Sequence, residues 1–116
     1  FGPKSHLTAI VDVWDSYYVA RAKAVMDGTW KPGDTWDGLK QGMLQMAPYN
    51  AAIPADVLAM AKKAQADIIA GTLHPFAGPI KDQMGMQKVA AGENLDDGSL
   101  LSMNWYVHGV QGKLPK

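Results

Sequence analysis

The sequence lacks cysteine, net charge and any long apolar stretch. Without cysteine, the chain cannot form a disulfide, a thiolate metal site or a cysteine nucleophile. Eleven Lys and Arg residues balance eleven Asp and Glu residues, and no basic run is longer than Lys62-Lys63, so we expect no nucleic-acid partner. The longest uncharged apolar run, residues 7–11, is far shorter than the roughly 20 residues of a membrane-spanning helix. We therefore expect that this chain does not cross a membrane.

Motifs that commonly carry catalysis or bind metals are also missing. His6, His74 and His108 form none of the HxxxH, HxH or HExxH spacings, so a zinc site would need carboxylates from distant loops. Ser16 and Ser99 lie outside any G-x-S-x-G turn. Neither glycine-rich phosphate-binding pattern occurs. We predict no metal, no cofactor and no catalytic residue.

The composition is that of a folded chain. With 116 residues, of which 47% are hydrophobic and 19% charged, it is long enough to form one domain or a piece of one. The sequence begins with Phe1-Gly2-Pro3 rather than with Met. We expect it to be a processed or trimmed piece of a longer protein.

The first element predicted is a buried strand. Residues 7–14 form an almost continuous, β-branched apolar run, which is typical of a parallel strand covered by helices on both faces. Asp15 or Ser16 is then available to cap a helix over residues 17–27. Gly28 is placed to adopt the left-handed conformation after that helix. A strand followed by a helix is half of a βαβ unit.

Shorter elements are predicted further along the chain, and their order indicates a layered α/β architecture. They are strands at residues 35–39 and 43–46, a helix that starts with Pro54 and ends at Gly71, a peripheral hairpin within residues 74–92, and a short helix within residues 99–107.

Asp12 and Trp14 are the predicted ligand-binding residues. In open α/β sheets, ligands bind beyond the carboxyl ends of the strands, and both residues lie at the end of the first predicted strand. The Asp12 carboxylate can accept hydrogen bonds, and the Trp14 indole can stack on a flat ligand. The structural alternatives are that Asp12 caps a neighbouring element or pairs with a lysine, and that Trp14 is a core residue.

Several strings, in consistent order, resemble the C-terminal third of the basic membrane protein family. These proteins are substrate-binding lipoproteins of ABC transporters, similar to the bacterial purine nucleoside receptor. The strings are Leu7-Thr8-Ala9-Ile10-Val11, Ala24-Val25-Met26-Asp27-Gly28-Thr29-Trp30-Lys31, Asp34-Thr35-Trp36-Asp37-Gly38-Leu39-Lys40-Gln41-Gly42-Met43, Phe76-Ala77-Gly78-Pro79-Ile80-Lys81-Asp82-Gln83 and Leu101-Ser102-Met103-Asn104-Trp105-Tyr106-Val107.

The resemblance implies the C-terminal part of a type I periplasmic-binding-protein fold, in which helices cover a mainly parallel sheet. Residues 1–73 would then supply a strand and helices to one of two lobes, and residues 74–116 a hairpin and a tail near the hinge. The full-length protein would lie in the periplasm or on the cell surface, attached by a lipid on its N-terminus. Its partners would be an ABC permease and a purine ligand.

One position departs from the family pattern. Where nucleoside-binding members have a lysine just after the first strand, this chain has Asp12. A carboxylate there accepts hydrogen bonds where an ammonium donates them, which suits the N–H groups of a nucleobase. We therefore expect a purine base such as adenine, or a nucleoside held differently from the family pattern.

These observations predict a substrate-binding component of an ABC importer, which closes around its ligand without making or breaking a bond. Two alternatives stay open. One is an enzyme acting on nucleosides, with Asp12, Asp15 and His6 as candidate acids and bases. The other is a surface receptor or antigen lipoprotein with no transport role.

Overall fold

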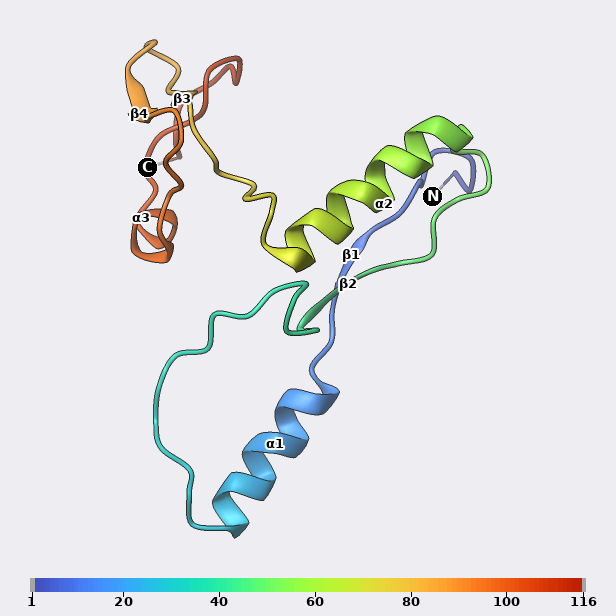
Figure 1. Cartoon of the computed structure of the whole chain (residues 1–116), viewed down its shortest axis with the longest axis vertical. Coiled ribbons are helices and arrows are strands. Elements are labelled where there is room, and N and C mark those ends of the chain that lie inside the picture. The colour runs from blue at the N-terminus through green and yellow to red at the C-terminus, as the bar shows by residue number, and fades with distance from the viewer. Residues whose placement is uncertain (1, 116) are drawn as a thin grey trace. The chain divides into compact units, whose positions relative to one another are not determined.

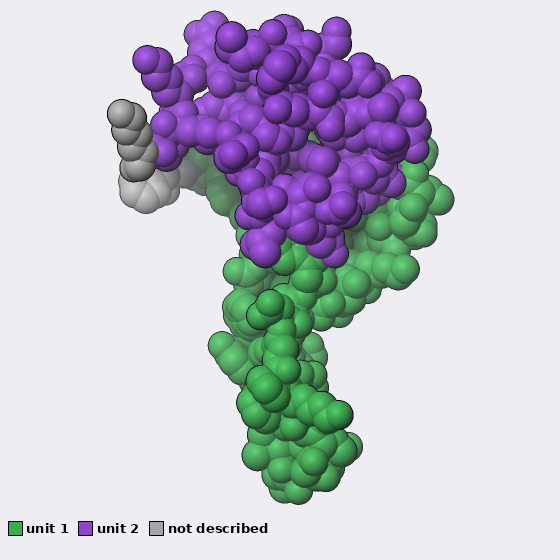
Figure 2. All heavy atoms as spheres, turned by 90° about the vertical axis from the view of Figure 1, so that its left-hand side faces the viewer, with its two compact units in different colours: residues 1–72 green, residues 73–116 purple. Residues whose placement is uncertain are grey.

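The computed structural model describes residues 2–115, which form three helices and four short strands (Figure 1). Their bounds are β1 (Ile10–Asp12), α1 (Asp15–Met26), β2 (Leu44–Met46), α2 (Ala55–Ala70), β3 (Ile80–Lys81), β4 (Gln87–Val89) and α3 (Asp97–Leu101). The chain divides into two compact units, unit 1 (Phe1–Thr72) and unit 2 (Leu73–Lys116), which are coloured separately in Figure 2.

The sheet of unit 1 is an antiparallel pair. Strand β1 pairs with β2, with Ile10 opposite Met46 and Asp12 opposite Leu44. The pairing continues beyond the strands, because the Val13 N–H donates to the Met43 carbonyl at 2.8 Å, and further bonds join the segments before β1 and after β2. This pairing fixes the end of β1, and therefore Asp12, against the start of β2.

The structure confirms a mixed α/β chain but not the parallel sheet. Both sheets within residues 2–115 are antiparallel pairs, and all three residues of β1 are exposed. The prediction of a strand buried on both faces is therefore wrong for this chain. An apolar run becomes buried only where other elements cover it, and in this chain Ile10 and Val11 remain 64% and 46% exposed.

Helix α1 follows β1 almost directly. Trp14 caps it through its backbone position alone, without a side-chain hydrogen bond, so the prediction that Asp15 or Ser16 caps the helix is wrong. Gly28 has a φ of +66°, which confirms the left-handed residue predicted after the helix. The short gap between β1 and α1 keeps Trp14 close to Asp12 in the chain.

Helix α2 ends as predicted. Pro54 precedes its first residue as the cap, and Gly71 has a φ of +76°, the left-handed conformation that lets the last carbonyls be satisfied. Residues 35–39 are not a strand, and only β2 forms in the region where two strands were predicted. The segment between α1 and β2 is consequently a long loop with freedom to approach α1.

Unit 2 is built around the predicted hairpin, which is confirmed. Strand β3 pairs antiparallel with β4, with Ile80 opposite Val89. Val89 is the one buried apolar residue among the described positions, and Asp82 is the one buried charged residue. The Asp82 carboxylate accepts hydrogen bonds from the N–H groups of Met84 and Met86 at 2.9 and 3.0 Å.

Helix α3 begins earlier than predicted and is shorter than residues 99–107. Asp96 caps it, because its carboxylate accepts a 2.7 Å hydrogen bond from the Ser99 N–H. Large apolar side chains remain exposed elsewhere, among them Ile10, Val19 and Met26. None of the helices in residues 2–115 combines the length and the apolar character that crossing a bilayer requires.

Candidate functional site

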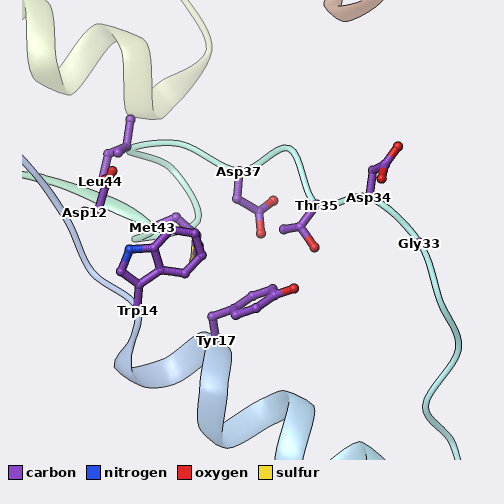
Figure 3. Close-up of a pocket in the computed structure, with 9 residues that line it drawn as sticks. All are labelled: Asp12, Trp14, Tyr17, Gly33, Asp34, Thr35, Asp37, Met43 and Leu44. Atoms are coloured by element: carbon purple, nitrogen blue, oxygen red, sulfur yellow. The ribbon is translucent and has the colours of Figure 1, made fainter.

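A cavity of about 340 Å³ lies within unit 1 (Figure 3). Its volume is in the range of small-molecule sites, which run from about 300 to 1,000 Å³. The residues that line it are Asp12, Trp14, Tyr17, Gly33, Asp34, Thr35, Asp37, Met43 and Leu44. Both predicted ligand-binding residues, Asp12 and Trp14, therefore face the same cavity.

The two sides of the cavity come from segments that the β1–β2 pair brings together. On one side, Asp12 ends β1, Trp14 caps α1, and Tyr17 lies in the first turn of that helix. On the other side, the loop of residues 33–37 approaches the helix, and Leu44 begins β2 opposite Asp12. The cavity thus depends on the loop that leaves the end of α1 and returns at β2, the partner strand of β1.

An aromatic cluster forms one wall. The rings of Trp14 and Tyr17 meet edge to face, with centroids 5.7 Å apart and planes at 80°, and Tyr18 stacks on Trp14 at 5.8 Å. The Arg21 guanidinium lies 5.3 Å from the centroid of the Tyr17 ring, one helical turn further on. Trp14 is 44% exposed, so it is not buried within unit 1.

Three carboxylates line the cavity without a cationic side chain among the lining residues. In residues 2–115, the ion pairs involve neither Asp12 nor Asp34 nor Asp37, so the alternative that Asp12 pairs with a lysine has no support there. In Figure 3 the side chains of Asp37 and Thr35 point toward the Tyr17 ring, whereas the Asp34 carboxylate points away from it. The site is therefore acidic and aromatic.

The structure adds residues that the sequence did not single out. Tyr17 was not among the predicted binding residues, and residues 35–37 were predicted to belong to a strand. The sequence signal that could have found the loop is the turn-forming pair Gly33-Asp34. Such a pair indicates a loop, and loops often carry functional side chains. The candidate enzyme residues do not gather here, since neither Asp15 nor His6 lines the cavity. Within the described part of the chain, no cluster of three or more His, Cys, Asp or Glu residues could hold a metal ion.

A second cavity, of about 470 Å³, lies within unit 2. Trp105 and Tyr106 line it together with Asp82. Lys88 links two of these groups, because its ammonium is 3.3 Å from the Asp82 carboxylate and 5.7 Å from the centroid of the Trp105 ring. Burial alone would raise the pKa of Asp82, but hydrogen bonds from Met86, Met84 and Lys88 hold it below its ordinary value. Through these contacts Asp82 holds residues of the hairpin together.

The unit 1 cavity, with aromatic rings and hydrogen-bond acceptors, is a candidate site for a small ligand. The chain is similar to a purine-binding protein of Brucella abortus (strain 2308), with which it is 51% identical over all 116 residues. Those residues are 33% of the relative, so the chain spans about a third of its length. No family model matches the chain. The similarity relates this chain to a purine-binding protein.

Proposed function

We propose that this chain is part of a solute-binding protein that holds a purine base or nucleoside as the substrate-binding component of an ABC importer. The observation that carries the proposal is the 51% identity to a purine-binding protein along the whole chain. The cavity that contains Asp12 and Trp14 supports it, because its volume and its aromatic wall suit a flat heterocycle.

Asp12 and Trp14 divide recognition between them. A carboxylate only accepts hydrogen bonds when ionised, so Asp12 favours the amino and ring N–H groups of a purine base. The Trp14 indole offers an apolar face for stacking, and Tyr17 supports it edge to face. The same atoms would bind a ribose hydroxyl less selectively, which is why adenine is the first ligand to test.

The wider proposal is the C-terminal part of a type I periplasmic-binding-protein fold of the basic membrane protein family. The exposed apolar residues of β1 and α1 support it, because such surfaces are normally covered, and the relative is about three times as long as this chain. In this proposal two lobes close on the purine and present a joined surface to the permease. A lipid anchor holds the protein in the periplasm or at the cell surface.

We further propose that the protein is not an enzyme. The test is to incubate the native protein that carries this chain with adenosine and to separate the products by chromatography. A stable complex from which intact adenosine is recovered supports a binding role. Release of free adenine would overturn it and favour the nucleoside-acting alternative.

Calorimetric titration of the same native protein with adenine, adenosine and guanosine tests the ligand. We expect saturable binding of at least one purine, and Asp12→Asn should weaken it by about tenfold or more because the acceptor loses its negative charge and one of its two oxygens becomes an NH₂ donor. Asp12→Lys should lose base binding or shift it toward nucleosides. Asp27→Asn, a neutralised carboxylate at the far end of α1, is the matched control.

The possible results separate two claims. No heat from any purine would contradict purine binding by this protein. Purine binding that Asp12→Asn leaves unchanged would contradict the role of Asp12 and leave the purine ligand in place.

A further inference from the structure

We infer that the unit 1 cavity selects purines by charge, preferring a purine whose ring carries a positive charge over its neutral counterpart and rejecting phosphorylated purines. This inference rests on the proposed function and concerns the same site. It names a substrate class, the cationic purines produced by ring alkylation or protonation, that purine binding alone does not imply.

The first argument is the uncompensated negative charge. Asp12, Asp34 and Asp37 line one cavity, and the ion pairs found in residues 2–115 include none of them. A carboxylate that faces the cavity attracts a cation held there and repels an anion such as a phosphate. The binding free energy is therefore expected to be more favourable for a cationic ligand, and less favourable for an anionic one, than for a neutral ligand.

The second argument is the aromatic wall, which is independent of the carboxylates. Trp14 and Tyr17 both line the cavity, in edge-to-face contact with ring planes at 80° to each other, so together they present aromatic surface to a ligand in the cavity. Indole and phenol faces attract cations, and tryptophan does so most strongly. The rings therefore favour binding of a flat ligand that carries a positive charge, as the carboxylates do.

Arg21 contacts this wall through Tyr17, but it does not line the cavity. Its guanidinium lies over the Tyr17 ring at 5.3 Å and is absent from the residues that line the cavity. It occupies a π face of Tyr17 from the helix side. Tyr18 stacks on Trp14, which is nevertheless 44% exposed, so the exposed part of the indole is the aromatic contact open to a ligand cation.

The test measures three ligands on the native protein that carries this chain. Guanosine is the neutral reference, 7-methylguanosine adds a positive charge to the ring, and guanosine 5′-monophosphate adds negative charge at the other end. We expect affinity to rise about tenfold with the methylated ring and to fall by at least about tenfold with the phosphate, each tenfold step being about 1.4 kcal/mol. Added salt should shrink both differences.

Variants locate the effect. Asp37→Asn should weaken 7-methylguanosine binding severalfold more than guanosine binding, because the neutral ligand gains less from that charge. Asp27→Asn, outside the cavity, should leave the ratio unchanged. An equal loss for both ligands in Asp37→Asn would indicate a structural effect and contradict the inference.

Failure of this inference differs from failure of the proposed function. If all three ligands bind equally, the charge selection is wrong and purine binding stands. If none of guanosine, adenosine, adenine and 7-methylguanosine binds, the proposal of purine binding itself is wrong. Binding of the methylated ligand that is weaker than that of guanosine would overturn the inference directly.

Discussion

A methyl group added at Gly78 should break the packing of the unit 2 hairpin. Gly78 lies where the chain passes β4, and its N–H donates a 2.8 Å hydrogen bond to the Glu93 carbonyl. A Cβ built on Gly78 would overlap the Ala90 carbonyl oxygen and would lie 2.7 Å from the Ala90 carbonyl carbon and 2.9 Å from Cγ1 of Val89. Gly78→Ala therefore forces atoms of two neighbouring residues apart.

The magnitude follows from which atoms must move. Overpacking a filled site typically costs about 1–3 kcal/mol, and the upper end applies where the neighbour is backbone that cannot rotate away. Ala90 presents its carbonyl group, so we expect a loss of about 3 kcal/mol in the free energy of unfolding of unit 2. The loss is large against a typical total stability of about 5–15 kcal/mol.

Urea unfolding and amide hydrogen exchange of β4 residues measure this loss. Gly98→Ala is the matched control, because its Cβ would meet only the Asp96 Oδ1 atom at 3.5 Å and alanine favours the helix. Combining Gly78→Ala with Val89→Ala should cost less than the sum of the two single changes, since one of the clashing atoms is removed. A Gly78→Ala protein with unchanged unfolding and unchanged exchange in β4 would refute the reasoning.

Two further predictions concern carboxylates of unit 2. The pKa of Asp82 is held below its ordinary value, so the stability it contributes is present above about pH 4 and is lost as pH falls through the lowered pKa; exchange of the Met84 and Met86 amides should therefore speed up in acid, and Asp82→Asn should remove that pH dependence. Hydrogen bonds from Ser99 lower the pKa of Asp96, so Asp96→Ala should loosen α3 at neutral pH, whereas Asp96→Asn, which keeps an acceptor, should retain most of its helical amide protection. Equal amide exchange in Asp96→Ala and in the unchanged protein would contradict the cap.

Local backbone chemistry was predictable from sequence. Gly28 and Gly71 both follow helices in the left-handed conformation, because the last carbonyls of a helix need that geometry and glycine adopts it without strain. The hairpin of unit 2 was likewise legible from its turn residues between two short extended runs. Such features depend on neighbours within a few residues.

Burial and pairing were not predictable in the same way. The apolar run that contains Ile10 predicts burial, yet Ile10 is 64% exposed. The partner of β1 is β2, more than thirty residues further on, as the 39-residue separation of the Thr8 to Ala47 hydrogen bond illustrates. Hydrophobic pattern indicates that a surface is suited to contact, but it does not name the surface that meets it.

Only part of the candidate site could be predicted from the sequence. Asp12 stood out because a charge ends an apolar strand, and Trp14 because it follows at the same edge. Asp37 and Tyr17 could not be joined to them, since a loop without periodicity brings Asp37 toward the helix. The binding roles of Asp12 and Trp14 stay predictions, tested by the titrations proposed above.

The dependence of the unit 1 cavity on the β1–β2 pair couples occupancy to chain closure. Closing a long loop costs entropy, and three residue pairs of a two-stranded sheet are a modest return for it. A ligand held by Trp14 on one side and by the loop of residues 33–37 on the other would bind only when β1 and β2 are paired. Binding would therefore shift the equilibrium toward the paired strands. Ligand concentration would then set how long the two strands stay paired, and protection of their amides would report the occupancy of the site.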